Sequence, residues 1–247
     1  VKQGGTRRGA NMGVLRIDHP DILEFITCKK DGDFSNFNIS VAITEEFMEA
    51  VKAGTDYTLY DPRDKSAVGT LNAAEVYDLI VNLAWATGDP GIIFIDRMNR
   101  DNPTPAIGEI EATNPCGEQP LLPYEACNLG SINLSRMLKR GNEGIDINWD
   151  KLKDVTHRAV RFLDDVIEVN NYPLPQIDEL VRGNRKIGLG VMGWADMLIE
   201  LGIGYNTAEA VELARKVMEF IATEAKAESH DLALERGVFP NFDKSIF

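Results

Sequence analysis

The apolar and polar positions of the chain follow two different periods, which predicts a mixture of strands and helices. Residues Phe37–Ile43 alternate with period two, as a half-buried strand does. Thr44 is a favourable helix cap before two glutamates, so we predict a helix after it that closes near Gly54. Residues Tyr57–Leu71 contain polar turn chemistry at Asp61-Pro62 and predict a hairpin or a long turn.

A second helix is predicted to start at Asn72 and to end at Gly88 and Pro90. Its apolar face consists of Val76, Leu79, Ile80, Leu83 and Ala84. The continuous apolar run Gly91–Ile95 follows, and such a run is typical of a strand buried on both sides. A helix followed by a short buried strand indicates the α/β class.

Two longer helices are predicted at Asp150–Val169 and from Thr207 to about Arg236. Between them, Lys186–Gly193 predicts a strand or tight turn that leads into a helix. Its glycines resemble the pattern G-x-G-x-x-G, but a lone match of that kind is a weak indication of a dinucleotide site. Close packing of the backbone is therefore the better interpretation.

Composition excludes several classes of protein. With 247 residues, 44% of them hydrophobic, the chain can bury a sizeable core. Its net charge of −13 repels a nucleic-acid backbone, so we expect no nucleic-acid partner. No apolar run reaches the roughly 20 residues of a membrane span, and the first residues contain no signal peptide. A cytoplasmic location without a membrane partner is expected.

A small constellation around Cys116 carries the candidate chemistry, because the amide of Asn114 and the carboxylate of Glu118 flank it two residues away on each side. Abstraction of hydrogen from an unactivated carbon needs a one-electron agent, and a cysteine thiyl is the strongest one among the ordinary side chains. A carboxylate can take the proton of a neighbouring hydroxyl, and an amide can orient hydroxyls. If the segment is extended, all three side chains face one substrate.

The other cysteines have less specific surroundings. Cys127 lies eleven residues after Cys116 and can supply reducing equivalents, but a disulfide needs a second thiol. Cys28 ends an apolar helical stretch and is expected to be structural. Taken without their neighbours, Cys116 and Cys127 would be interpreted as inert core residues, since free cysteine is among the most buried residue types.

A metal site is a weaker alternative. Cys116 and Cys127 have no further cysteine or histidine at ligand spacing, and the three histidines lie far apart without a motif. The histidines are therefore expected to be structural or solvated, and no metal site is predicted. The basic, glycine-rich stretch before Arg16 can meet an anionic small molecule, although by itself it is also consistent with a flexible turn.

Several segments together resemble the catalytic subunit of ribonucleotide reductases, in the order of that family and over essentially the whole chain. The segments are Gln3–Ala10, His19–Ile26, Asn114–Leu121 and Arg185–Gly193. The sequence motif N-P-C-G-E-Q-P-L and the short spacing between the two cysteines are most similar to those of the adenosylcobalamin-dependent class II enzymes. The resemblance implies reduction of ribonucleotides to 2′-deoxyribonucleotides for DNA synthesis.

The resemblance also implies roles for particular residues. Cys116 would carry the thiyl radical, Asn114 and Glu118 would contact the ribose hydroxyls, and Cys127 would be one of two reducing thiols. The segment from Gln3 to Asn11 resembles the loop that reports the allosteric effector to the substrate base. The site residues of this loop are Gln3, Gly4, Gly5, Arg7 and Arg8, and Gln3 and Arg7 are the contacts expected first.

The fold implied is a ten-stranded α/β barrel around a central catalytic loop, of which residues 1–247 would form a part that is incomplete at both ends. The partner of Cys127 would precede Val1, and a phosphate-binding loop would follow Phe247. The expected partners are a ribonucleotide, deoxynucleotide or ATP effectors, a dithiol reductant such as thioredoxin, a companion polypeptide that completes the barrel, and a second copy in a homodimer.

Two alternatives remain open from the sequence. One is the large subunit of a class I reductase, which performs the same chemistry with a radical from a separate metal subunit. The other is a non-catalytic fragment that folds or binds a nucleotide.

Overall fold

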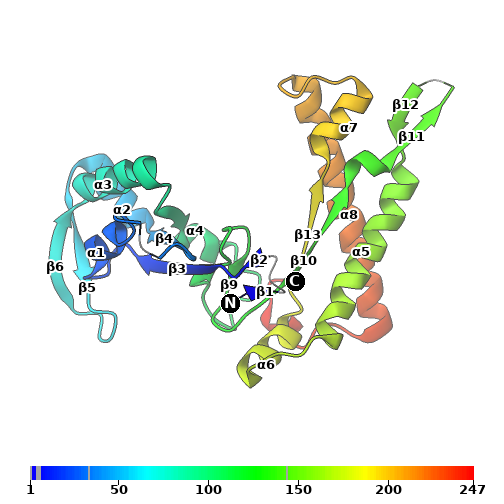
Figure 1. Ribbon diagram of the computed structural model, residues 1–247. Helices are drawn as coiled ribbons and strands as arrows, with labels where there is room; N and C mark the ends of the chain where they lie inside the picture. Colours follow the sequence, from blue (N-terminus) through cyan, green and yellow to red (C-terminus); the bar gives the residue numbers. More distant parts are fainter. Residues whose placement is uncertain (1, 4–6, 33, 143) are drawn as a thin grey trace. The chain divides into compact units, whose positions relative to one another are not determined.

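The computed structural model in Figure 1 describes residues 2–3, 7–32, 34–142 and 144–247. The chain divides into two compact units. The first comprises Val1–Pro123 with Lys244–Ile246, and the second comprises Tyr124–Asp243 with Phe247. Helices alternate with parallel strands in both units, which confirms the α/β class.

The first unit is built on a three-stranded parallel sheet with the strand order β3-β4-β7. Its elements are β1 (Lys2–Gln3), β2 (Arg7–Arg8), β3 (Asn11–Arg16), α1 (Ile22–Thr27), β4 (Phe37–Ile43), α2 (Glu45–Ala53), β5 (Asp56–Tyr60), β6 (Ala67–Asn72), α3 (Ala73–Thr87), β7 (Gly91–Phe94), α4 (Ile95–Arg100), β8 (Ala112–Thr113) and β9 (Pro120–Leu121). Helix α1 connects β3 to β4, and the segment from α2 to α3 connects β4 to β7. Strands β5 and β6 form the predicted hairpin.

Local capping explains where the helices of this unit begin and end. The side chain of Thr44 accepts a hydrogen bond from the backbone N–H of Phe47, and that of Asn72 accepts one from the N–H of Glu75. Gly54 ends α2 with a φ of 67°, a conformation that glycine adopts without a steric penalty. The predicted bounds of both helices are confirmed.

The core of the first unit lies between the sheet and the helices that follow its strands. Its largest fully buried side chains are Ile17, Ile22, Ile26, Val41, Ile43, Phe47 and Ile80. The burial of Val76, Ile80 and Leu83 confirms the predicted apolar face of α3.

The prediction for Gly91–Ile95 was wrong in one respect. The strand ends at Phe94, which is exposed, while Ile93 is buried and Ile95 already belongs to α4. Within the described residues, β7 pairs only with β4, so it is an edge strand and not a central one. An apolar run does not distinguish these two positions, because both need residues that favour a strand.

The second unit packs two long helices against a pair of parallel strands (Figure 1). Its elements are β10 (Asn128–Asn133), the 3₁₀ helix η1 (Leu134–Met137), β11 (Leu138–Gly141), β12 (Gly144–Ile147), α5 (Trp149–Val169), α6 (Pro175–Asn184), β13 (Ile187–Met192), α7 (Trp194–Leu201) and α8 (Ala208–Arg236). The 3₁₀ helix η2 (Phe242–Lys244) spans the boundary, since Lys244 is grouped with the first unit. Helix α5 contacts α8, β10 and β13. The buried core between them includes Ile132, Leu134, Leu152, Met197, Val217 and Ile221.

The glycine-rich segment before α7 forms strand β13, which confirms the prediction of a strand that leads into a helix. Gly193 ends the strand with a φ of 70°, and a Cβ atom at this position would collide with the side chain of Asn133. That side chain accepts hydrogen bonds from the backbone N–H and the hydroxyl of Ser135. Close packing of the backbone is therefore the role of this glycine.

The strands of the described residues form separate two- and three-stranded sheets, and none of these sheets closes into a barrel. The α/β class is thus confirmed, whereas the ten-stranded barrel stays a prediction. Every helix in the described ranges is too short or too polar to cross a bilayer.

Candidate functional site

Cys116 lies in the tight turn of a small hairpin formed by β8 and β9. The backbone N–H of Gly117 donates to the carbonyl oxygen of Asn114 at 3.0 Å, which closes a turn over Pro115 and Cys116. Proline is favoured at the second position of such a turn because its φ is fixed near the required value. Cys116, Gly117 and Glu118 are all exposed.

The segment Asn114–Glu118 is therefore not extended, so the condition under which its alternate side chains would share one strand face is not met. Asn114 stabilises the turn itself, because its side-chain oxygen accepts from the N–H of Gln119 at 3.0 Å. Its own N–H donates to the carbonyl of Gln119 at 3.2 Å. The turn still brings the predicted amide, thiol and carboxylate together on one exposed loop.

The turn is attached to the sheet of the first unit by a contact that the sequence did not reveal. The side-chain Nδ2 of Asn38 donates to the carbonyl oxygen of Pro115 at 2.5 Å, and β8 packs against β3. Asn38 stands near the start of β4, opposite Met12 of β3. A polar residue within an alternating strand gives no signal of a partner that lies 77 positions away.

The predicted effector loop leads into this same end of the sheet. Gly4 and Gly5 lie outside the described residues, whereas the backbones of Gln3 and Arg7 pair with each other in the antiparallel strands β1 and β2, next to the pair Lys2 and Arg8. The chain then enters β3 at Asn11, whose N–H donates to the carbonyl of Asn36 at 3.0 Å. Asn11 also pairs with Phe37, so the exit of the loop and the Cys116 turn contact Phe37 and Asn38, two consecutive residues of β4.

Cys127 belongs to the second unit and directly precedes β10. Strand β10 pairs with β13 from Asn128 and Ile187 onward, so Cys127 and Lys186 are the residues just before the first matched pair. Strand alternation puts Cys127 on the side opposite Asn128, whose amide donates to the carbonyl of Leu163 in α5. Cys127 is partly buried.

A buried polar network lies beside Cys127. The carboxylate of Glu125 is fully buried and contacts the ammonium of Lys186 at 2.6 Å. Its other oxygen accepts from the amide of Asn184 at 2.8 Å, and the amide of Asn241 donates in turn to Asn184 at 2.8 Å. A buried carboxylate is stable in its charged form only with such partners.

Removal of the cation should therefore destabilise the fold. Lys186→Met leaves the Glu125 carboxylate buried without its cation, and we expect the free energy of unfolding to fall by about 3 kcal/mol. This value is at the lower end of the usual range because the Lys186 side chain is 17% exposed. Urea titration of the chain would measure it.

The matched control is Lys226→Met, since Lys226 is an exposed lysine of α8 and should tolerate the change. The double variant Glu125→Leu/Lys186→Met should regain much of the lost stability, because it also removes the buried carboxylate that has lost its cation. Equal stability of the Lys186→Met and Lys226→Met variants would contradict the structural importance of the pair.

Cys28 and His157 have structural surroundings, whereas the side chain of His230 is 72% exposed. Cys28 follows the last residue of α1, and burial raises the pKa of its thiol. His157 lies between the carboxylates of Glu224 at 2.8 Å and Glu228 at 2.9 Å, which joins α5 to α8. In the described ranges, no group of three or more histidine, cysteine or acidic side chains is suited to a metal ion.

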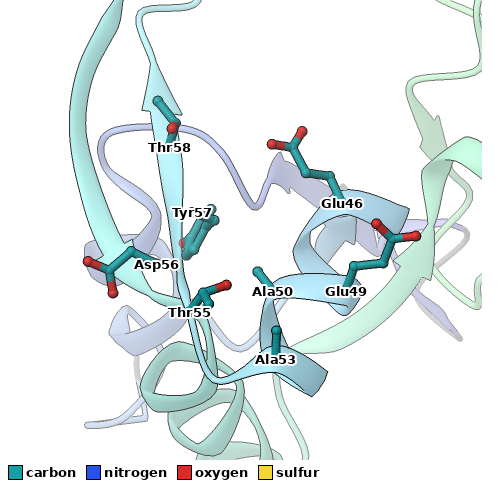
Figure 2. A pocket seen from close by; sticks show the side chains of 8 residues that line it. All are labelled: Glu46, Glu49, Ala50, Ala53, Thr55, Asp56, Tyr57 and Thr58. Carbon is teal, nitrogen blue, oxygen red and sulfur yellow. The ribbon is translucent and has the colours of Figure 1, made fainter.

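Two cavities of the first unit are lined by residues other than those of the Cys116 turn. One, of about 630 Å³, lies where β3, β4 and β7 end, and its lining includes Arg16, Ala42 and Ile95. The other, of about 330 Å³, lies between α2 and β5 (Figure 2). Its charged lining residues are Glu46, Glu49 and Asp56, all acidic, so it repels a phosphate.

Comparison with known proteins gives one consistent family. Residues 1–247 match the family model described as the barrel domain of ribonucleotide reductase. A protein of Thermoplasma acidophilum, named vitamin B12-dependent ribonucleoside-diphosphate reductase, is 53% identical over 97% of this chain and 31% of its own length. A protein of Mycobacterium tuberculosis with the same name is 51% identical over 100% of this chain and 35% of its own length.

A more distant relative is the putative ribonucleoside-diphosphate reductase large subunit of Frog virus 3. It is 35% identical over 97% of this chain and 44% of its own length. The chain spans about a third of the length of the two relatives with the higher identity, 31% and 35% respectively.

Proposed function

The chain belongs to the ribonucleotide reductase family through its barrel domain, and from this premise we propose that it supplies catalytic residues for the reduction of ribonucleotides to 2′-deoxyribonucleotides. The observation that carries the proposal is the exposed turn that holds Asn114, Cys116 and Glu118 together. A thiol, an amide and a carboxylate on one short loop can meet a single ribose. The high identity to reductases over nearly the whole chain supports it.

Each residue of the turn has a separate task. Cys116, as a thiyl radical, takes the 3′ hydrogen atom of the ribose, and Glu118 accepts the proton of the 3′ hydroxyl. Asn114 keeps the turn closed through its side-chain oxygen. A general base of this kind typically contributes about 10² to 10⁴ in rate. The 2′ hydroxyl then leaves as water.

The reduction needs two electrons and two protons, which a pair of thiols supplies as it becomes a disulfide. Cys127 is proposed as one of the two thiols, with a second cysteine from the remainder of a longer reductase. Overall one ribonucleotide and two thiols give one deoxyribonucleotide, one disulfide and one water. Cys116 recovers its hydrogen atom and is not consumed. An external dithiol such as thioredoxin would restore the pair.

The proposed cofactor is adenosylcobalamin, following the names of the two relatives of high identity. When bound, it supplies the one-electron oxidant that a cysteine thiyl requires. The exposed position of Cys116 fits this cofactor, because a thiol at the surface of a turn can be reached from outside the hairpin. Cys116, Gly117 and Glu118 are the residues that would border it.

The cofactor can be tested separately from the reaction. With this chain as part of a polypeptide of the relatives' full length, we expect anaerobic turnover when adenosylcobalamin and a dithiol are added, with no second protein present. Formation of deoxynucleotides would be measured by chromatography, and omission of the cofactor is the control. Turnover only with a metal-containing second subunit would reject the cofactor and favour a class I reductase.

The segment from Gln3 to Asn11 is proposed to couple an effector to the choice of substrate base. Deoxynucleotides or ATP are the proposed effectors, and Arg7 and Arg8 can hydrogen-bond to base edges or phosphates. The exit of this loop at the strand pair that also holds the Cys116 turn supports the assignment. Association into a homodimer is proposed as well.

We further propose that residues 1–247 form part of a ten-stranded barrel around the hairpin that bears Cys116. The parallel pairs β3-β4-β7 and β10-β13 would be segments of its wall. Open strand edges of this kind are usually covered in a complete domain. The remainder of a longer chain, or a companion polypeptide, would supply the missing strands.

A further inference from the structure

An ion pair contacts the backbone of the first residues of β4, which precede the point where β4 begins to pair with β7. Strand β7 pairs with β4 only from Ser40 onward. Before that point, the ammonium of Lys29 donates to the carbonyl of Phe37 at 2.5 Å, and Asp89 accepts from the N–H of Ile39 at 3.4 Å. These two side chains thus replace a neighbouring strand.

Lys29 and Asp89 also bind each other, with 2.6 Å between Nζ and Oδ2. Their side chains are only 13% and 22% exposed, so solvent screens the pair less than it would at the surface. We call these two residues the Lys29–Asp89 clamp. The clamp fixes the backbone on both sides of Asn38.

Asn38 is the residue between the two clamped positions, and its amide reaches the carbonyl oxygen of Pro115 at 2.5 Å. Pro115 directly precedes Cys116, so this hydrogen bond ends one residue from the thiol. The hairpin that carries the turn is short, since β8 and β9 share only the pairs Ala112 with Leu121 and Thr113 with Pro120. A hairpin this short is only marginally stable by itself, so the turn depends on contacts with the sheet, which are the hydrogen bond of Asn38 and the packing of β8 on β3.

We propose that Asn38, held by the Lys29–Asp89 clamp, is a positioning residue that fixes Cys116 relative to the sheet. The inference rests on the proposed function only for its catalytic consequence, because the contact itself belongs to the fold. A reacting atom must stand about 3 to 3.5 Å from its target, and a displacement of about 1 Å can cost on the order of 10²-fold in rate. In this role Asn38 acts through its hydrogen bond to Pro115.

The first test measures the position of the turn without any reductase activity. In the chain of residues 1–247, Asn38→Ala removes the donor, and Asn38→Asp replaces it with a carboxylate that only accepts hydrogen bonds. Both should speed hydrogen exchange at the N–H groups of Gly117 and Gln119 by about 2- to 10-fold, the factor that one net hydrogen bond contributes. Both should also change the rate at which iodoacetamide alkylates Cys116, followed by mass spectrometry.

The matched control is Asn36→Ala, because the recorded hydrogen bond of Asn36 uses its backbone carbonyl, which survives the substitution. Its exchange and alkylation rates should equal those of the unmodified chain. Asn38→Gln keeps the amide donor on a longer side chain, and it should recover part of the protection that Asn38→Ala loses. Unchanged exchange at Gly117 and Gln119 in Asn38→Ala would overturn the proposal.

The second test uses a full-length reductase that contains these residues. We expect Asn38→Ala to lower kcat by about 10- to 100-fold while KM for the ribonucleotide stays within about twofold. A rise in KM with kcat unchanged would overturn the positioning role. If the turn loosens as expected but the unmodified full-length protein makes no deoxynucleotide, the proposed function fails and the structural role of Asn38 stands.

Discussion

Replacement of Cys116 by serine in a full-length reductase is expected to abolish deoxynucleotide formation while nucleotide binding persists. The O–H bond of serine is stronger than the S–H bond of cysteine, so serine cannot form the radical that takes the 3′ hydrogen. The thiol is exposed in a turn that is closed by backbone groups and by Asn114, so the substitution removes no core contact. Product formation and equilibrium binding of the ribonucleotide would be measured side by side.

Cys28→Ser is the matched control for this experiment. Cys28 is also a free cysteine of the first unit, but it caps the end of α1 and lies outside the Cys116 turn. We expect the control to retain most of the activity. Substantial turnover by the Cys116→Ser variant would instead remove Cys116 from the radical role, and the search for the reacting thiol would move to Cys127.

The sequence predicted well those features that neighbouring residues determine. Thr44, Asn72 and Thr207 each cap the helix that was expected to follow, because a cap needs only its own side chain and an N–H group three residues later. The hairpin of β5 and β6 and the strand before Gly193 depend on similarly local patterns. For the same reason the α/β class could be predicted from the succession of helices and strands.

Features that depend on distant residues could not be predicted. Glu125 and Lys186 lie 61 positions apart, and nothing in the local pattern indicates that they form a buried ion pair. Asn38 and Pro115 are separated even more widely. The edge position of β7 likewise depends on which strand lies beside it, and the apolar run contains no information about that neighbour.

Part of the candidate site could be predicted from the sequence, and part of it could not. The composition of the Asn114, Cys116 and Glu118 constellation was visible in the sequence, since it needs only residue types and spacing. Its conformation was not, because the sequence argument considered only an extended segment, whereas the segment is a turn closed by Gly117 and by the side chain of Asn114. Proline and glycine on either side of Cys116 were the available signal, since both are typical of turns.

The second of the two large effects concerns Glu118, whose carboxylate is exposed on the same turn as Cys116. Glu118→Gln keeps the size of the side chain and removes the base. We expect turnover in a full-length reductase to fall by about 10² to 10⁴, the usual contribution of a general base. Binding of the ribonucleotide should change little, because an amide can still hydrogen-bond to the ribose hydroxyls.

A control variant, and the step at which the reaction stops, make the Glu118 experiment specific. Glu111→Gln is the control, because Glu111 is another exposed carboxylate and lies at the base of the hairpin. Its backbone N–H donates to the carbonyl oxygen of Leu121. This variant should leave turnover near the unmodified value.

With Glu118→Gln, exchange of the 3′ hydrogen with a labelled Cys116 thiol should continue, while release of the 2′ hydroxyl slows. Because the proton of the 3′ hydroxyl must leave before the 2′ hydroxyl can depart as water, loss of the base stops the reaction between these two events. Equal turnover by the two glutamine variants would mean that another group accepts the proton, and the carboxylate two residues after the thiol would then have only a binding role.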